Sequence, residues 1–294
     1  MNTEKTAVEG TIDRLERSRG RPLAVIAVQS LEPELVPILA RCLRAQGRVP
    51  ALDLLLNTFG GKVDVARRLA LLVREYTDDL TVLVADHARS AGTLLCLAAD
   101  RLELGPASSL GPLDPHLSQI SATSTAGPHH ISTAELRAFT TFAQEWCGLQ
   151  EGAERAFATV SQRIFPSTVG ALLRAERHML AIIGELAARQ VPDPDARERL
   201  AARLVTCYHS HDHDITRAEA GSLGLVLTDL PDAHDSWCWD VLAAASPSIS
   251  GPPDHDPVTI GFLRAGGVTA WQRCLPARPD RPETSAWWDT TENG

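Results

Sequence analysis

Lysine is nearly missing from this chain of 294 residues, in which Lys5 and Lys62 are the only two and arginine supplies the other positive charges. The formal net charge is −9, which argues against a nucleic-acid-binding protein, because such a protein usually carries a basic face. Apolar residues make up 44% and charged residues 22%, the proportions of an ordinary globular protein. We therefore expect one large domain or two small ones with a sizeable core.

Paired cysteines and long apolar runs are also lacking. The six cysteines contain no CxxC pair, and most lie in apolar surroundings, as buried free thiols of a reducing compartment do. The first residues, MNTEKTAVEG, lack the plan of a signal peptide, and no apolar run approaches the ~20 residues that span a bilayer. We expect a soluble, cytoplasmic protein without a membrane span.

What is present, over the first hundred residues, is an alternation of apolar runs and amphipathic stretches. The stretch 22–30 (PLAVIAVQS) is a continuous apolar run, typical of a strand covered on both faces. The pattern predicts further strands at 51–61, 80–86 and 101–105, and helices at 32–44, 63–76 and 91–99. Strands and helices at this spacing predict parallel βαβ units with right-handed crossovers, hence an α/β fold.

The texture then changes. Residues about 130–205 read as a helical insertion of three helices, broken near Pro166 and Pro192, and 215–226 returns to a short helix and a strand start. We expect an N-terminal segment (1–20), a main domain (21–245) containing the insertion, and a linker with a C-terminal extension (246–294). The tryptophans of the extension suit packing or oligomer contacts better than a ligand site.

Three short motifs carry the chemistry. In LLLNTFGG (54–61) a buried strand ends in Gly60 and Gly61, which allow either close backbone approach to a ligand or a simple tight turn. In ARSAG (88–92) Ser90 lies at a strand-to-helix junction, as an N-cap or as a nucleophile. In SSLGPLDPHLS (108–118) a loop stiffened by glycine and proline carries His116, either exposed or functional.

Together and in this order, the motifs resemble the serine peptidases of the Clp protease proteolytic-subunit (Clp/crotonase) fold. They are most similar to the serine dehydrogenase-proteinase-like branch, related to signal peptide peptidase A. The resemblance covers about residues 21–120 and resumes at about 205–228. It implies a serine peptidase that hydrolyses peptide bonds through an acyl-enzyme, with no cofactor and as a homo-oligomer. Ser90 would be the nucleophile, and the N–H groups of Gly61 and Ala91 would form the oxyanion hole.

The resemblance also names a base and an acid. His116 matches the family's histidine in its distance from Ser90, and Asp212 falls where an acid precedes a short late helix. A neutral imidazole accepts the serine proton, and a carboxylate on its other nitrogen fixes the tautomer. The signal peptide peptidase relatives use a lysine base, for which Lys62 is the alternative here.

Other interpretations stay open. His209, His211 and His213 alternate in HSHDHD (209–214), so in a strand they would share one face and could bind zinc; a polar surface loop is the simpler interpretation. Asp212 would take part in the zinc site in one interpretation and orient His116 in the other, so the two interpretations partly exclude each other. A catalytically silent oligomeric scaffold or binding module would keep the same fold. A crotonase-like acyl-thioester enzyme would use the same paired backbone donors, but it would need an acyl-CoA pocket.

Overall fold

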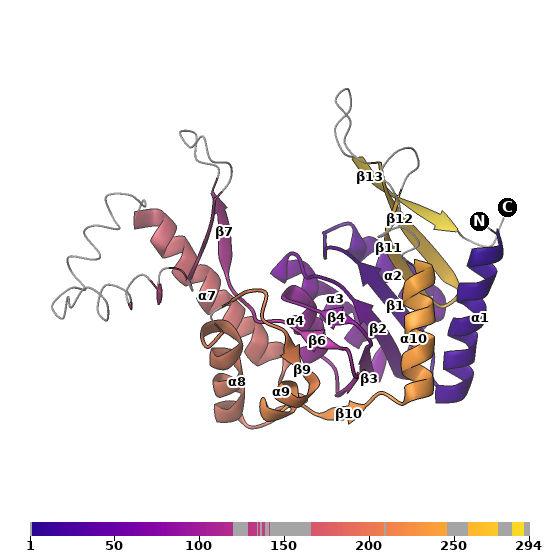
Figure 1. Ribbon diagram of the computed structural model, residues 1–294, viewed down its shortest axis with the longest axis horizontal. Coiled ribbons are helices and arrows are strands. Elements are labelled where there is room, and N and C mark those ends of the chain that lie inside the picture. Colours follow the sequence, from indigo (N-terminus) through magenta and orange to yellow (C-terminus); the bar gives the residue numbers. More distant parts are fainter. Residues whose placement is uncertain are drawn as a thin grey trace.

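The computed structural model describes residues 2–119, 129–133, 135, 137, 138, 141, 166–208, 210–245, 258–275 and 284–290. Its centre is an eight-stranded sheet in the order β10-β5-β3-β2-β1-β11-β12-β13 (Figure 1). The five strands from β10 to β1 are parallel, and the last three are antiparallel. The predicted α/β class with parallel βαβ units is confirmed.

The parallel part follows the predicted alternation closely. Its elements, in chain order, are α1 (Asn2–Arg19), β1 (Leu23–Val28), α2 (Leu35–Gln46), β2 (Val49–Asn57), α3 (Val63–Glu75), β3 (Thr77–Val84), β4 (His87–Ala88), α4 (Ala91–Leu97) and β5 (Arg101–Leu104). The strand β10 (Leu227–Asp229) completes this part at the edge beside β5.

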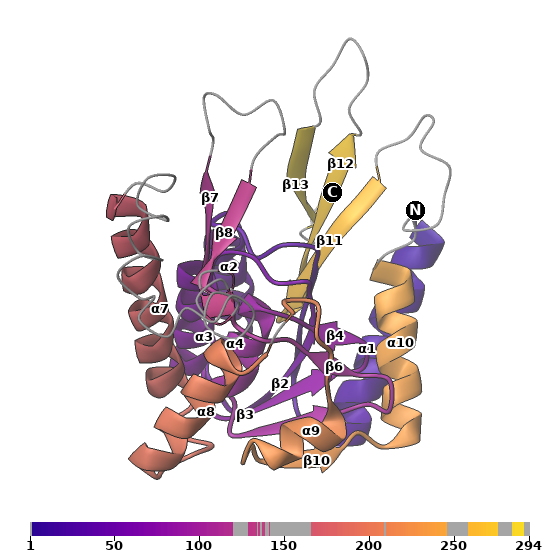
Figure 2. The ribbon, with the colours of Figure 1, turned by 60° about the vertical axis from the view of Figure 1, so that its left-hand side comes forward.

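Both faces of this sheet are covered, which explains the continuous apolar run of β1. Leu23, Val25 and Ala27 pack on one side with α1 and with α10 (Asp232–Ala245). Ala24 and Ile26 point to the other side, into the core beneath α2, α3 and α4. Figure 2 shows α1 and α10 on one side of the sheet and α2, α3 and α4 on the other. A strand buried on both faces has no polar face to alternate with.

A cluster of charges lies between α1 and the sheet. Asp53 on β2 is fully buried and forms an ion pair with Arg19 at the end of α1. Arg19 also binds both carboxylate oxygens of Glu103 on β5, at 2.8 and 2.9 Å. Burial lowers the pKa of Arg19, but the hydrogen bonds and charges of Glu103 and Asp53 outweigh it and raise the pKa, so the guanidinium stays charged.

The C-terminal extension adds three strands to this sheet, which the sequence analysis did not predict. β11 (Val258–Ala265) pairs with β1, β12 (Val268–Leu275) with β11, and β13 (Thr284–Thr290) with β12. Gly266 and Gly267 form the two-residue turn of the β11–β12 hairpin, both with positive φ. A Gly-Gly pair between two apolar runs is a hairpin signal in its own right.

The helices α7 (Pro166–Leu186) and α8 (Pro194–Thr206) pack on each other, and α7 also contacts α3 and α4. They form the described part of the predicted insertion, and they begin near the predicted breaks at Pro166 and Pro192. The first of the three predicted helices lies mostly outside the described residues. None of the helices that the structure describes is long and apolar enough to cross a membrane.

Candidate active site

Ser90 connects β4 to α4 in a conformation that serine rarely adopts. Its φ is 49° and its ψ is −123°, the one positive φ outside glycine among the described residues. It holds the N-cap position of α4, but its side chain makes no capping hydrogen bond. The N-cap interpretation is therefore wrong as an account of this hydroxyl. A strained serine on a sharp strand-to-helix turn with an uncommitted hydroxyl has the local geometry of a nucleophile elbow.

Gly60 brings the end of β2 against this serine. A Cβ built on Gly60 would lie 2.7 Å from Ser90 Cβ and 3.2 Å from Ser90 Oγ, and its φ is 120°. Any other residue here would collide with Ser90, so both the contact and the backbone conformation require glycine. The close approach at Gly60 is to Ser90 within the chain, and approach of this backbone to a ligand stays a prediction.

The next residue, Gly61, presents its backbone outward. Leu31 N–H donates to Gly60 O at 2.6 Å, and Lys62 N–H donates to Leu31 O at 3.0 Å. Because this parallel bridge uses the groups on either side of Gly61, the Gly61 N–H faces away from Leu31. Within the described part of the chain, neither this N–H nor that of Ala91 has a backbone acceptor. Both predicted oxyanion donors are thus uncommitted backbone groups.

Thr93 holds the 108–118 loop against the same junction. Its buried hydroxyl accepts from Gly111 N–H at 3.0 Å and lies 2.8 and 2.9 Å from the carbonyls of Ala88 and Gly111. A Cβ on Gly111 would lie 2.8 Å from Ser90 N. Thr93 was not predicted as a site residue, although a threonine in the first turn after Ser90 was a visible signal.

A small three-stranded sheet assembles the segments that carry the predicted residues. β4 pairs with β6 (Ser109–Leu110), which pairs antiparallel with β9 (Ile215–Thr216). Ala88, Leu110 and Ile215 therefore lie side by side, and the chain continues from this row to Ser90, to the loop of His116 and back to 209–214. Tertiary structure thus brings together three segments that are far apart in the sequence (Figure 1).

The two candidate bases differ in what the structure describes. His116 begins β7 (His116–Gln119), paired with Ser132 of β8 (His129–Ser132), so its backbone lies in a hairpin rather than in a free loop. Lys62 binds Glu32 at 2.8 Å and is well exposed. The hydrogen bond and the charge of Glu32 raise the pKa of Lys62, which works against the neutral amine that a lysine base requires.

The described part of HSHDHD, residues 210–214, contains a turn and no strand. Residues 211–212 form the turn, residues 211–214 are exposed, and β9 begins only at Ile215. The structure therefore agrees with the polar surface loop and not with a strand that places its histidines on one face. Asp212 is exposed and its N–H donates to Ser210 Oγ at 3.1 Å. Asp214 forms an ion pair with Arg89, the residue before Ser90. His213 binds Glu219 at 3.0 Å, and His209 lies outside the described residues.

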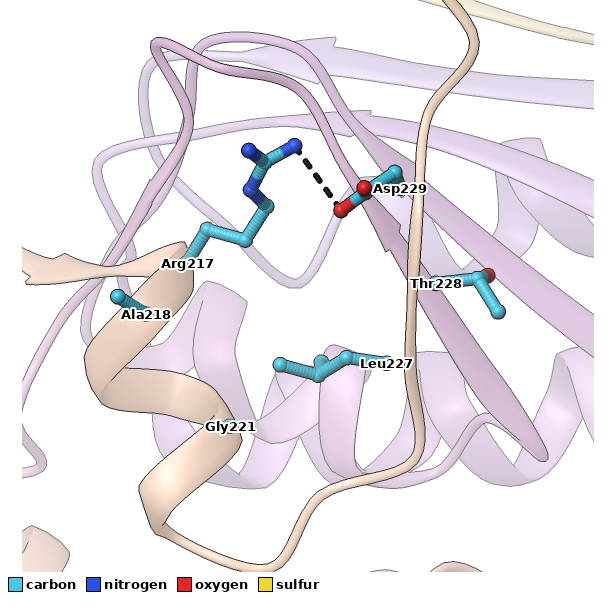
Figure 3. Close-up of a pocket in the computed structure, with 6 residues that line it drawn as sticks. All are labelled: Arg217, Ala218, Gly221, Leu227, Thr228 and Asp229. Carbon is cyan, nitrogen blue, oxygen red and sulfur yellow. Dashed lines mark ion pairs between the residues drawn. The ribbon is translucent and has the colours of Figure 1, made fainter.

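Among the residues described, no three His, Cys, Asp or Glu side chains gather as a metal site would require. A shallow pocket of about 430 Å³ lies between α9 (Arg217–Ser222) and β10, where Arg217 binds Asp229 at 3.1 Å (Figure 3). Its lining contains none of the predicted site residues. The Ser90 junction is therefore separate from this pocket.

With this geometry in place, comparison with known proteins identifies the same segment. Residues 31–132 match the sequence model of a family described as ClpP-like SDH-type serine proteinase. The match contains Gly60, Gly61, Ser90 and the loop of His116. The resemblance drawn from the three motifs is confirmed: residues 31–132 are similar to the ClpP-like SDH-type serine proteinases.

Two uncharacterized proteins of Methanocaldococcus jannaschii are also similar. One is 28% identical over 193 residues, covering 65% of this chain and 59% of that relative. The other is 26% identical over 234 residues, covering 75% of this chain and 71% of the relative. The chain thus spans less than two thirds of the first relative.

Among solved structures, a mutant of the 1510-N membrane-bound stomatin-specific protease matches at 16% identity and a TM-score of 0.45, covering 72% of this chain and 82% of that one. ClpP1 from Listeria monocytogenes matches at 13% identity and a TM-score of 0.39, covering 72% and 94%.

Proposed function

We propose that this protein is a serine peptidase that hydrolyses peptide bonds through an acyl-enzyme on Ser90. The observation that carries the proposal is the backbone of Ser90, strained at positive φ, with its hydroxyl uncapped and Gly60 in van der Waals contact. Strained backbone costs of order 1–3 kcal/mol and persists where the surroundings enforce it, often at functional sites. A purely structural N-cap would need neither the strain nor the free hydroxyl.

In the proposed reaction, Ser90 Oγ attacks the carbonyl carbon of the scissile bond while His116 takes its proton. The N–H groups of Gly61 and Ala91 stabilise the oxyanion, and loss of one such donor typically costs about 3–4 kcal/mol in the transition state. The protonated base then gives its proton to the leaving amine, and water hydrolyses the acyl-enzyme by the same steps.

Asp212 is proposed as the acid that orients His116. It lies in the segment that β9 brings to the Ser90 junction, which supports the assignment. It is exposed, however, whereas the orienting acid of a triad is buried against the imidazole. The assignment is therefore tested by kinetics: Asp212→Asn should lower kcat more than it raises KM where Asp212 orients His116, and unchanged kinetics would remove Asp212 from the site.

The test is labelling of the full chain with a fluorophosphonate probe, followed by mass-spectrometric mapping of the modified residue. We expect labelling on Ser90 in the wild type and none in Ser90→Ala, with circular dichroism showing both chains folded. Labelling elsewhere would move the site. Complete failure of the folded wild type to label, measured across the oligomeric states separated by gel filtration, would favour the silent scaffold.

A further inference from the structure

Arg89 and Asp214 lie at the same end of the small sheet, one residue beyond its last row. Arg89 follows Ala88 of β4, and Asp214 precedes Ile215 of β9. Gly111 follows Leu110 on the strand between them, and a Cβ on Gly111 would lie 3.1 Å from Arg89 Cα. The ion pair of Arg89 with Asp214 therefore bridges β6 from one outer strand to the other.

The backbone of Arg89 is held firmly on both sides. Its N–H donates to Thr58 O at 3.0 Å, and its carbonyl accepts from Gly92 N–H at 2.8 Å. Arg89 is also part of the turn that places Ser90 at positive φ. The guanidinium thus extends from a fixed point beside the nucleophile to the segment that carries Asp212.

The ion pair does little for stability. The side chains of Arg89 and Asp214 are 29% and 50% exposed. Pairs with this exposure typically contribute about 0–1 kcal/mol to folding. Position is a different matter, because a shift of about 1 Å in a catalytic group can cost orders of magnitude in rate. The 211–214 turn has other contacts too: the N–H groups of Asp212 and His213 donate to Ser210, and the His213 ring contacts Glu219 and Tyr208. The Arg89–Asp214 pair differs from these contacts in reaching the residue next to Ser90.

We propose that the Arg89–Asp214 ion pair positions residues 210–214 against the Ser90 junction, so that Arg89 and Asp214 are positioning residues of the active site. The inference rests on the proposed function and adds to it two residues that touch no reacting atom. It also gives Asp214 a role of its own, since Asp214 anchors to Arg89 the segment that carries Asp212.

The experiment compares Asp214→Asn with the charge swap of Arg89→Asp and Asp214→Arg, in the full chain. The matched control is Glu185→Gln, which removes the ion pair of Arg67 on α3 with Glu185 on α7. In this pair the guanidinium lies 2.6 and 2.7 Å from the two carboxylate oxygens, and both side chains are exposed to a similar degree as those of Arg89 and Asp214. The readout is the rate of fluorophosphonate labelling at Ser90. We expect about a tenfold loss in Asp214→Asn, recovery of most of that loss in the swap, and no change in Glu185→Gln. The melting temperatures should all agree closely.

Raising the ionic strength should slow labelling of the wild type more than that of Asp214→Asn, because salt screens an exposed pair. Equal rates in Asp214→Asn and Glu185→Gln would overturn the inference while leaving the proposed peptidase intact, and so would a swap that stays as slow as the single variant. If the wild type does not label, the proposed function fails, and hydrogen exchange still decides on the pair. Faster exchange at 210–214 in Asp214→Asn, but not in Glu185→Gln, supports positioning; unchanged exchange contradicts it.

Discussion

Polar groups are paired in one region of the molecule and unpaired in another. The paired groups form the Arg19–Asp53–Glu103 cluster, and the unpaired groups lie at the Ser90 junction, on the other side of the parallel sheet. In the cluster, formal charges are buried, and the fully buried carboxylate of Asp53 is paired with Arg19. At the junction, an uncharged hydroxyl and two N–H groups stay uncommitted, and the backbone of Ser90 is strained. One region uses polar groups to hold elements together. The other keeps polar groups available at a cost in stability.

The comparison separates stability from activity. Changes in the charge cluster should lower stability while leaving chemistry at Ser90 intact, and changes at the junction should do the reverse. The helix α1 contributes to this division, because Arg19 at its end ties it to β2 and β5.

The largest effect is expected at the proposed base. His116→Ala should lower hydrolysis by roughly 10⁴-fold, because Ser90 then has no group to take its proton. Lys62→Met should change it less than about threefold, since Glu32 keeps the lysine protonated. The measurement is kcat/KM on a fluorogenic peptide across pH, where a histidine base gives an acid limb near pH 6–7. The opposite ranking would assign the chemistry to a Ser/Lys pair.

Breaking the buried cluster should have the second largest effect. Asp53→Asn leaves the buried guanidinium of Arg19 short of one partner, and we expect a loss of about 3–5 kcal/mol in the free energy of unfolding. Asp78→Asn, which removes the exposed Arg48–Asp78 pair, is the control and should cost less than about 1 kcal/mol. Urea unfolding measures both. Equal losses of unfolding free energy in the two variants would contradict the role of the cluster in stability. Slower labelling of Ser90 in folded Asp53→Asn would show that the cluster also affects the Ser90 junction.

Relief of strain at the junction should raise stability by a smaller amount. Ser90→Gly permits the positive φ without a steric penalty, and we expect a gain of about 1 kcal/mol together with loss of labelling. Ser90→Ala also loses labelling but keeps a Cβ in the strained conformation, so it should gain nothing. Thermal unfolding of the pair isolates the backbone effect. Identical melting temperatures would show that the serine stores no strain.

The smallest effect concerns acid stability beside the site. Burial raises the pKa of Glu219, but hydrogen bonds from His213 and Tyr208 outweigh it and bring the pKa below its usual value. The unfolded chain therefore binds the proton more tightly. The stabilisation is present above the ordinary glutamate pKa of about 4.3 and is lost as the pH falls through the folded value. Glu219→Gln should reduce the dependence of the free energy of unfolding on pH, measured by urea unfolding between about pH 5 and 3. An unchanged curve would contradict the prediction.

The local pattern of the sequence was sufficient for the elements that neighbouring residues determine. The buried strands, the helix from Val63 and the Ser90 junction follow from runs of apolar residues and small residues at turns. The Gly266–Gly267 hairpin was also visible in the sequence, and it was missed because the tail was interpreted by its composition instead of its alternation.

The order of strands and helices, and the serine between a strand and a helix, could be predicted from local sequence, because these features depend on residues near one another in the chain. Only the tertiary structure decided that Gly60 touches Ser90, that Asp53 pairs with Arg19, and that β11 extends the sheet beside β1. It also decided that Asp214 lies beside Arg89, 125 residues away. Such contacts depend on how β4, β6 and β9 pair, and pairing between distant strands leaves no periodic signal in either one.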